Sequence, residues 1–279
     1  MARLADLVWG IGIGEALGLP FQDMPQGTFE CTDFEGYRAY NKPEGTWGDY
    51  TSITLALCDT IKRYQRGLGV PKESQFRASL SDYISGGLYA FRADRFCTNK
   101  DLINSVRNEI GNSDISSNSA FCCLGGMVLG TMDTKVSRLN VEAICGTTHQ
   151  HPIALDSALL SANITKNLTR GMVMEDILLS IEPKMTDTVY SDCALWINQT
   201  TLPKVTSDNV VEVLKTALWS VMTSNSYREA VCKAVNHGVA TRELGAITGG
   251  FAGLAFGLDV DLKERVLGKD LLNKFIYEF

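Results

Sequence analysis

The chain has 279 residues, with 26 Lys or Arg against 32 Asp or Glu and a formal net charge of -6. A hydrophobic fraction of 45% with only seven prolines is typical of a globular protein and excludes an intrinsically disordered chain. The acidic balance argues against general binding to nucleic acid, although a few backbone N–H groups can still hold a small anionic ligand.

The N-terminal residues 4–21 form the most membrane-like stretch of the chain, but Asp6 and Glu15 interrupt it. A signal peptide needs an unbroken apolar core, and a membrane-spanning helix needs about 20 apolar residues. We therefore expect neither, and no membrane partner. The eight cysteines include no C-x-x-C pair, and those inside apolar runs resemble small buried side chains. A reducing compartment, the cytoplasm, is the expected location.

Four glycines within the same stretch invite comparison with a dinucleotide-binding motif. They are Gly10, Gly12, Gly14 and Gly18. The spacing does not fit that motif, because Leu17 stands where its third glycine belongs and no strand precedes it. Small residues at these positions instead predict a helix that packs very closely on a neighbour.

Five further segments carry the helical spacing of apolar residues. They are residues 51–64, residues 141–169 as two helices broken near His151 and Pro152, residues 208–222 opening at Ser207 and Asp208, residues 226–236 opening at a capping box of Ser226 and Glu229, and residues 243–257. Strand signals are scarce, and short β structure is expected only within residues 27–40. The sequence predicts one all-α domain over residues 1–279.

Two polar loops lead into apolar helices and are candidate binding sites. In the glycine-flanked loop 45–52, Asp49 and Ser52 suit helix capping and the binding of an anion or metal equally well. The serine-rich loop 116–120 leaves the same alternatives open. His149 and His151 favour capping or core packing over metal binding, because no third ligand lies nearby in the sequence.

Four blocks of sequence, in order, resemble the ADP-ribosylglycohydrolase family. Residues 10–18 are similar to its G-x-x-x-G-D-A-L-G helix, with Glu15 for the usual Asp, and residues 47–56 are similar to its W-T-D-D-T-x-M-x-L-A segment. Residues 117–120 and 148–152 resemble S-N-G-A-A-M-R and T-H-x-H-P, and residues 226–257 resemble the stretch ending N-x-G-G-D-T-D-T-x-G-A-I-x-G. The resemblance implies an all-α, compact, single-domain orthogonal helical bundle.

The resemblance also implies a metal site, which this chain has largely lost. Family enzymes hold two Mg²⁺ ions between the T-D-D and D-T-D-T segments and use a Glu that follows the first block. Here the Glu position falls on Gln22, T-D-D falls on residues 48–50, and D-T-D-T falls on residues 240–243, where Arg242 replaces an aspartate. Asp49 alone remains of the four metal-site aspartates. We therefore expect no metal and no cofactor, and a guanidinium that neutralises Asp49 or a ligand phosphate.

From this pattern we expect a binder of an ADP-ribose-like or adenine-nucleotide-derived ligand without metal-dependent hydrolysis, as a phage-type counter-defence protein would be. The expected ligand-binding residues are Gln22, Trp47, Asp49, Tyr50, Ser117, Asn118, Ser119, His149 and Arg242. One alternative is a divergent ADP-ribosyl hydrolase with Asp49 and Glu243 as catalytic residues. Another is a structural protein that reuses the fold with an extensive subunit interface. The expected partner is a small nucleotide-derived molecule, and an oligomer is compatible with the sequence.

Overall fold

The computed structural model describes residues 2–64, 70–115, 119–132, 137–186, 188–199 and 205–277. Within these ranges the chain forms α-helices and short 3-10 helices but no strand, and its bridges outside helices are two isolated pairs, Pro25 with Gly238 and Asn112 with His149. The all-α prediction is confirmed, whereas the β structure expected within residues 27–40 was wrong.

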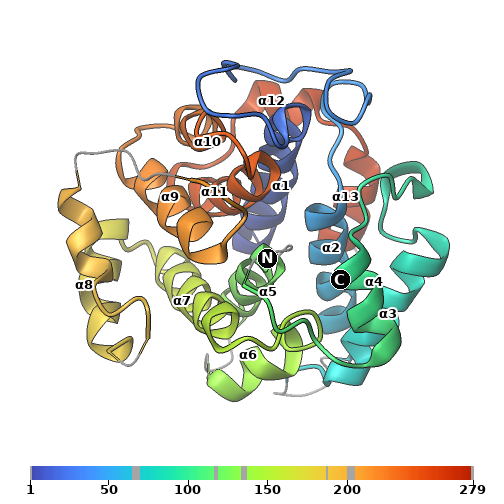
Figure 1. Cartoon of the computed structure of the whole chain (residues 1–279), viewed down its shortest axis with the longest axis horizontal. Coiled ribbons are helices and arrows are strands. Elements are labelled where there is room, and N and C mark those ends of the chain that lie inside the picture. Colours follow the sequence, from blue (N-terminus) through green and yellow to red (C-terminus); the bar gives the residue numbers. More distant parts are fainter. Residues whose placement is uncertain are drawn as a thin grey trace.

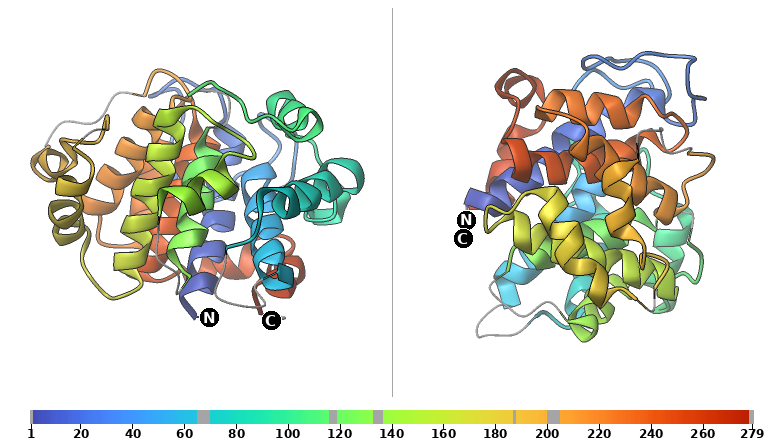
Figure 2. Two further views of the ribbon diagram at one scale, coloured as in Figure 1. Left: turned by 90° about the horizontal axis from the view of Figure 1, so that it is seen from below. Right: turned by 90° about the vertical axis from the view of Figure 1, so that its left-hand side faces the viewer.

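The two longest connections between consecutive α-helices are residues 19–48, which include the loop of residues 22–48, and residues 182–209. The α-helices are α1 (Ala2–Gly18), α2 (Asp49–Tyr64), α3 (Glu73–Gly86), α4 (Lys100–Asn108), α5 (Ala120–Gly130), α6 (Arg138–Cys145), α7 (Pro152–Leu168), α8 (Met174–Ile181), α9 (Val210–Met222), α10 (Tyr227–Val235), α11 (Thr241–Phe256), α12 (Val260–Arg265) and α13 (Lys269–Tyr277). In Figure 1, α1, α5 and α11 lie near the centre, α8 lies at one edge, and α3 and α4 lie at the opposite edge. The start of α1 and the end of α13 lie on the same side of the molecule (Figure 2).

Helices α1 and α11 are in direct backbone contact along their length, and glycines make this possible. A Cβ added to Gly10 would lie 2.2 Å from the carbonyl oxygen of Gly249, and one added to Gly14 would lie 2.0 Å from that of Gly245. Only glycine fits such an approach without moving a backbone. The close helix packing predicted from the glycine spacing is confirmed.

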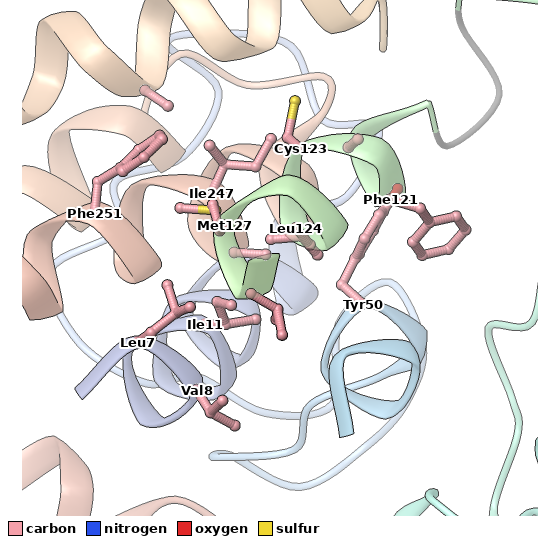
Figure 3. Packing of buried hydrophobic residues seen from close by; sticks show 14 of the residues in the cluster. Leu7, Val8, Ile11, Tyr50, Phe121, Cys123, Leu124, Met127, Ile247 and Phe251 are labelled. Atoms are coloured by element: carbon pink, nitrogen blue, oxygen red, sulfur yellow. The ribbon is translucent and has the colours of Figure 1, made fainter. Parts of the chain in front are cut away.

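The core is built where α1, α5 and α11 meet. Figure 3 shows side chains from these helices converging, among them Ile11 of α1, Met127 of α5 and Phe251 of α11. Each of the three is fully buried. The stretch Arg3–Phe21 is long and apolar enough to cross a membrane by length and composition, but most of it is buried inside the protein. This burial is typical of a core helix.

Helix boundaries follow local capping. The predicted break near Pro152 is present, and the Nδ1 atom of His151 accepts from the backbone N–H of Ile153 at 3.2 Å. The helix expected to open at residues 207–208 begins instead at Val210, because the side chain of Asn209 is the group that caps it. A carboxamide at the N-cap satisfies one of the exposed N–H groups of the first turn.

Candidate functional site

The first turns of α2 and α11 meet the last turn of α1 around a group of buried charged side chains. Asp49 and Tyr50 open α2, Arg242 and Glu243 stand in the first turn of α11, and Glu15 stands near the end of α1. We call these five residues the Arg242 cluster. The most exposed of them is Arg242, at 4%. The three helices that supply the cluster adjoin one another in Figure 1.

An ion pair lies at the centre of the cluster. The Nη1 atom of Arg242 donates to Oδ1 of Asp49 at 2.7 Å and lies 3.8 Å from Oε1 of Glu15. These residues belong to separate sequence motifs, and the fold brings them together. A buried guanidinium is stable only when carboxylates balance its charge. Arg242 is therefore held in place by the acidic groups around it.

Glu15 binds the buried N-terminal turn of α2 from outside that helix. Its Oε1 atom accepts from the backbone N–H of Tyr50 at 3.2 Å, and Oε2 accepts from the N–H of Thr51 at 2.9 Å and from its hydroxyl at 2.6 Å. These N–H groups have no partner within their own helix, and the helix dipole favours a negative charge beside them. Glu15 thus fixes the start of α2, and with it the position of Asp49.

The opposite side of the guanidinium is lined by aromatic rings. The Cζ atom of Arg242 lies 5.1 Å from the ring centroid of Tyr50 and 5.3 Å from that of Tyr40, distances at which a cation is attracted to the ring. The hydroxyl of Tyr50 donates to Oε1 of Glu243 at 2.6 Å, and its ring packs against Phe121 of α5. Tyr50 therefore links the cluster to the start of α5, as Figure 3 shows.

Gln22 caps α11 in this structure. Its Oε1 atom accepts from the backbone N–H of Arg242 at 3.0 Å and from the hydroxyl of Thr241 at 3.3 Å. The expectation from sequence was ligand binding, whereas the amide oxygen already has two donors within the protein. Gln22 thereby ties the loop of residues 22–48 to the helix that carries Arg242.

Burial and charge shift the proton affinities of the cluster. Burial, together with the negative charge of Asp49, raises the pKa of Glu15 to about 7. Burial also raises the pKa of Glu243, and it raises that of the Tyr50 hydroxyl well above its usual value. Burial alone would lower the pKa of Arg242, but the neighbouring carboxylates, Asp49 first, raise it far above normal. Three carboxyl groups thus face one permanent cation, and protons retained on the carboxyl groups reduce the remaining negative charge.

The family resemblance implies Mg²⁺, and the side chains present do not fit it. Three buried polar atoms of the cluster lack a hydrogen-bond partner: Oδ2 of Asp49, Oε2 of Glu243 and Nε of Arg242. Two oxygens are too few for a metal cage, and the guanidinium already satisfies the other oxygen of Asp49. Among the described residues, no three His, Cys, Asp or Glu side chains are arranged to hold a metal ion.

Three other residues predicted to bind a ligand make contacts within the protein or lie in its interior. They are Trp47, Ser119 and His149. The indole N–H of Trp47 donates to the carbonyl of Leu267 at 2.7 Å, so this ring fastens the loop before α2 to the segment between α12 and α13. The hydroxyl of Ser119 donates to the carbonyl of Ile115 at 2.5 Å, and His149 is 2% exposed. Ser117 and Asn118 lie outside the described residues.

The residues predicted from sequence did not include Glu15, which belongs to the cluster, or two residues near it. Cys97 follows the 3-10 helix Phe91–Ala93, and its thiol donates to Oδ1 of Asp49 at 3.6 Å. Tyr40 lies on the long loop before α2 and covers Arg242. Neither belongs to a periodic segment or a motif, so the sequence carried no signal for them.

Comparisons with known proteins agree on one family. A family model described as ADP-ribosylglycohydrolase matches residues 1–274. The ADP-ribosylarginine hydrolase Tri1 of Pseudomonas putida (strain GB-1) is 23% identical over 279 aligned residues, covering 92% of this chain and 71% of that protein. Tri1 of Serratia proteamaculans (strain 568) is 21% identical over 263, covering 89% of this chain and 70% of that protein. A solved structure titled "ADP-ribosylglycohydrolase-related protein complex" has a TM-score of 0.77 at 19% identity, covering 98% of this chain and 96% of that one, which shows a shared all-α fold.

Proposed function

The chain belongs to the ADP-ribosylglycohydrolase family, and from this premise we propose that it binds an ADP-ribose-like or other adenine-nucleotide-derived ligand without metal-dependent hydrolysis. The observation that carries the proposal is the buried 2.7 Å ion pair between Arg242 and Asp49. It puts a fixed positive charge where the resemblance implies metal ions between the first turns of α2 and α11.

The charge on Arg242 opposes a divalent cation at this position. Two unit charges 4 Å apart interact by about 4 kcal/mol at the effective dielectric constant of a protein, and a doubly charged ion doubles that repulsion. Arginine cannot lose its proton under these conditions, so the repulsion persists at every pH of interest. The guanidinium and a metal ion therefore compete for Asp49. The guanidinium has the advantage because it is part of the chain and is always present at the site.

Ligand binding is supported by what surrounds the guanidinium. The second carboxylate oxygens of Asp49 and Glu243 have no donor, and ribose hydroxyls are donors of the matching kind. The start of α5 adjoins the cluster through the contact between Phe121 and Tyr50, and helix N-termini favour phosphate groups. Tyr40, which is partly exposed on the loop of residues 22–48, is the side chain that a ligand would displace to reach Arg242.

A divergent hydrolase is the second candidate, and one observation favours it. The curated relatives carry the name ADP-ribosylarginine hydrolase, and Glu243 is a buried carboxyl group whose pKa is raised, as a general acid requires. Such an enzyme would act with Asp49 and Glu243 and without metal. A rate enhancement of many powers of ten is difficult to keep after the metal charges are lost, so this reading ranks second.

Calorimetry and a product assay separate these functions. We expect saturable heat with ADP-ribose, a cyclic ADP-ribose isomer or a cyclic dinucleotide, unchanged by EDTA, and no ADP-ribose released from ADP-ribosylated arginine with or without Mg²⁺. Release that requires Mg²⁺ would overturn the proposal, and metal-independent release lost in Asp49→Ala would establish the second candidate. No heat from any of these ligands would favour a structural role.

Arg242→Lys should weaken binding, while Lys269→Ala on the surface should not.

A further inference from the structure

Two thiols from distant parts of the sequence meet beside a surface pocket, away from the Arg242 cluster. Cys31 lies in the loop of residues 22–48, and Cys232 lies on α10. Both line a pocket of about 640 Å³ together with polar side chains that include Arg228. The thiol of Cys31 donates to the carbonyl of Leu17 at 3.8 Å, and its sulfur lies near enough to that of Cys232 for each thiol to alter the proton affinity of the other. They therefore form a pair that a small solute can reach from the pocket.

The backbones that carry the two thiols are fixed relative to each other. The N–H of Cys31 donates to Oδ1 of Asn236 at 2.7 Å, and the Nδ2 atom of Asn236 donates back to the carbonyl of Cys31 at 3.0 Å. Asn236 stands one turn after Cys232, and residues four apart share a helix face. An isolated bridge between Pro25 and Gly238 holds the same loop against the end of α10. The pairing of Cys31 with Cys232 thus belongs to the fold rather than to chance side-chain positions.

The two thiols differ in exposure and in charge environment. Cys31 is 1% exposed, whereas Cys232 is partly exposed to the pocket. The neighbouring Cys31 thiol lowers the pKa of Cys232, and the positive charge of Arg228 acts in the same direction, while burial, Asp33 and Asp259 oppose them. The thiolate is the reactive form of cysteine. Cys232 is therefore suited to attack an oxidant, and Cys31 is suited to react with the product.

We propose that Cys31 and Cys232 form a peroxide-responsive dithiol that closes to a disulfide. The sulfur of Cys232 attacks one oxygen of the peroxide, the O–O bond breaks, and Cys232 becomes a sulfenic acid while the second oxygen leaves as water. The sulfur of Cys31 then attacks the sulfur of Cys232, the S–O bond breaks, and water leaves with the proton of Cys31. In sum, two thiols lose two electrons and one hydrogen peroxide becomes two waters.

The disulfide would fasten the loop of residues 22–48 to α10. This loop caps α11 through Gln22 and covers Arg242 with Tyr40. A covalent bond between Cys31 and Cys232 would restrict the loop at its middle, and a cross-link that closes a long stretch of chain stabilises the fold. The oxidised protein should therefore have a higher Tm than the reduced protein.

The chain provides an internal control in a second thiol pair. The Cys122 thiol donates to the carbonyl of Cys145 at 3.7 Å, and the Cys145 thiol donates to the carbonyl of Cys122 at 3.5 Å. These residues are 0% and 2% exposed, so an oxidant must enter the core to reach them. If proximity alone decided the reaction, both thiol pairs would be oxidised. If access to the oxidant and the nearby charge of Arg228 decide it, only the pair at the pocket is oxidised.

The test is treatment of the reduced, folded protein with hydrogen peroxide, followed by alkylation and digestion with trypsin without reduction. We expect peptide 4–38 linked to peptide 229–233, formed at least about tenfold faster than any product of Cys122 or Cys145 because thiolate character and exposure set the rate. Cys31→Ser should leave a sulfenic acid at Cys232 that dimedone traps, and Cys58→Ser should still form the bridge. Thermal unfolding of each variant checks that it is folded.

Three outcomes would overturn the proposal. The first is a folded protein in which Cys232 is oxidised to sulfinic acid while Cys31 stays free. The second is oxidation of Cys122 and Cys145 at the same rate as the pocket pair. The third is a disulfide that forms between Cys31 and Cys232 but leaves the Tm unchanged or lower. None of these readouts depends on ligand binding or hydrolysis, so the proposal stands apart from the proposed function.

Discussion

Gly48 and Glu15 meet at the edge of the buried cluster, where Oε1 of Glu15 leaves no room for a side chain at position 48. A Cβ on Gly48 would lie 3.4 Å from Nη1 of Arg242 and 2.9 Å from Oε1 of Glu15. The family resemblance implies a threonine at the position of Gly48 and an aspartate at that of Arg242. A Cβ at position 48 would be in ordinary contact with Arg242, so the atoms that exclude a side chain there are those of Glu15 and Cys97.

Gly48→Thr should destabilise the protein by about 1–3 kcal/mol, the usual cost of adding atoms to a closely packed interior. Besides the contacts with Glu15 and Arg242, the new Cβ would lie 2.4 Å from the sulfur of Cys97. Urea unfolding measures the loss. Gly86→Ala is the matched control, since a Cβ there meets nothing within 4 Å. A Gly48→Thr variant as stable as the native protein would show that the cluster can rearrange freely.

Arg242→Leu should cost about 3–5 kcal/mol of unfolding free energy, because it leaves the carboxylate of Asp49 buried without its counter-charge. Lys269→Ala, which removes a surface ion pair with Glu264, should cost about 1 kcal/mol or less. Double replacement of Arg242 and Asp49 by Leu and Asn should recover part of the loss. Equal effects of Arg242→Leu and Lys269→Ala would contradict a central role for this guanidinium.

Stability should fall as pH rises through the weakly acidic range because of Glu15. Its pKa of about 7 in the folded protein lies above the ordinary value of 4.5, so the folded state holds this proton more tightly than the unfolded state does. The contribution is fully present below about pH 4.5 and is lost as pH approaches about 7. Glu15→Gln should flatten this slope in urea unfolding series. Glu229→Gln changes an exposed carboxyl group whose pKa is lowered, so this variant should keep the fall in stability with rising pH.

Much of the fold could be predicted because its signals are local. The small residues of α1 predict a close helix contact, and Gly10 and Gly14 make it with α11. His151 and Pro152 predict a helix start, since proline suits the first turn. Motifs named four of the five cluster residues, Asp49, Tyr50, Arg242 and Glu243, but they predicted neither that these residues meet nor that Glu15 joins them.

The remainder depends on contacts between segments far apart in the chain. Residues near Cys31 have strand-like composition, yet their hydrogen bonds go to the side chain of Asn236, so no strand forms. Tyr40 and Cys97 reach the cluster from irregular loops, where apolar spacing gives no direction. Gln22 was assigned to a ligand from its place in a motif, whereas the first turn of α11 takes its amide oxygen. Which partner a polar group finds is decided by tertiary packing.

Replacing the guanidinium by a carboxylate should convert the cluster into a metal site. Asp at position 242 would join Asp49, Glu15 and Glu243, giving the hard oxygen ligands and negative charge that draw a divalent cation out of water. An ion that binds only the folded state stabilises that state by about 2.7 kcal/mol when its concentration is 100 times its Kd. We therefore expect Mn²⁺ or Mg²⁺ to raise the Tm of Arg242→Asp and EDTA to reverse the rise. The Tm of the native protein should not change with the metal ion. Neither should that of the Arg242→Leu variant, in which both the guanidinium and the new carboxylate are absent. A native protein whose Tm rises with the metal would show that Arg242 yields its place, and the proposed metal-free function would fail with it.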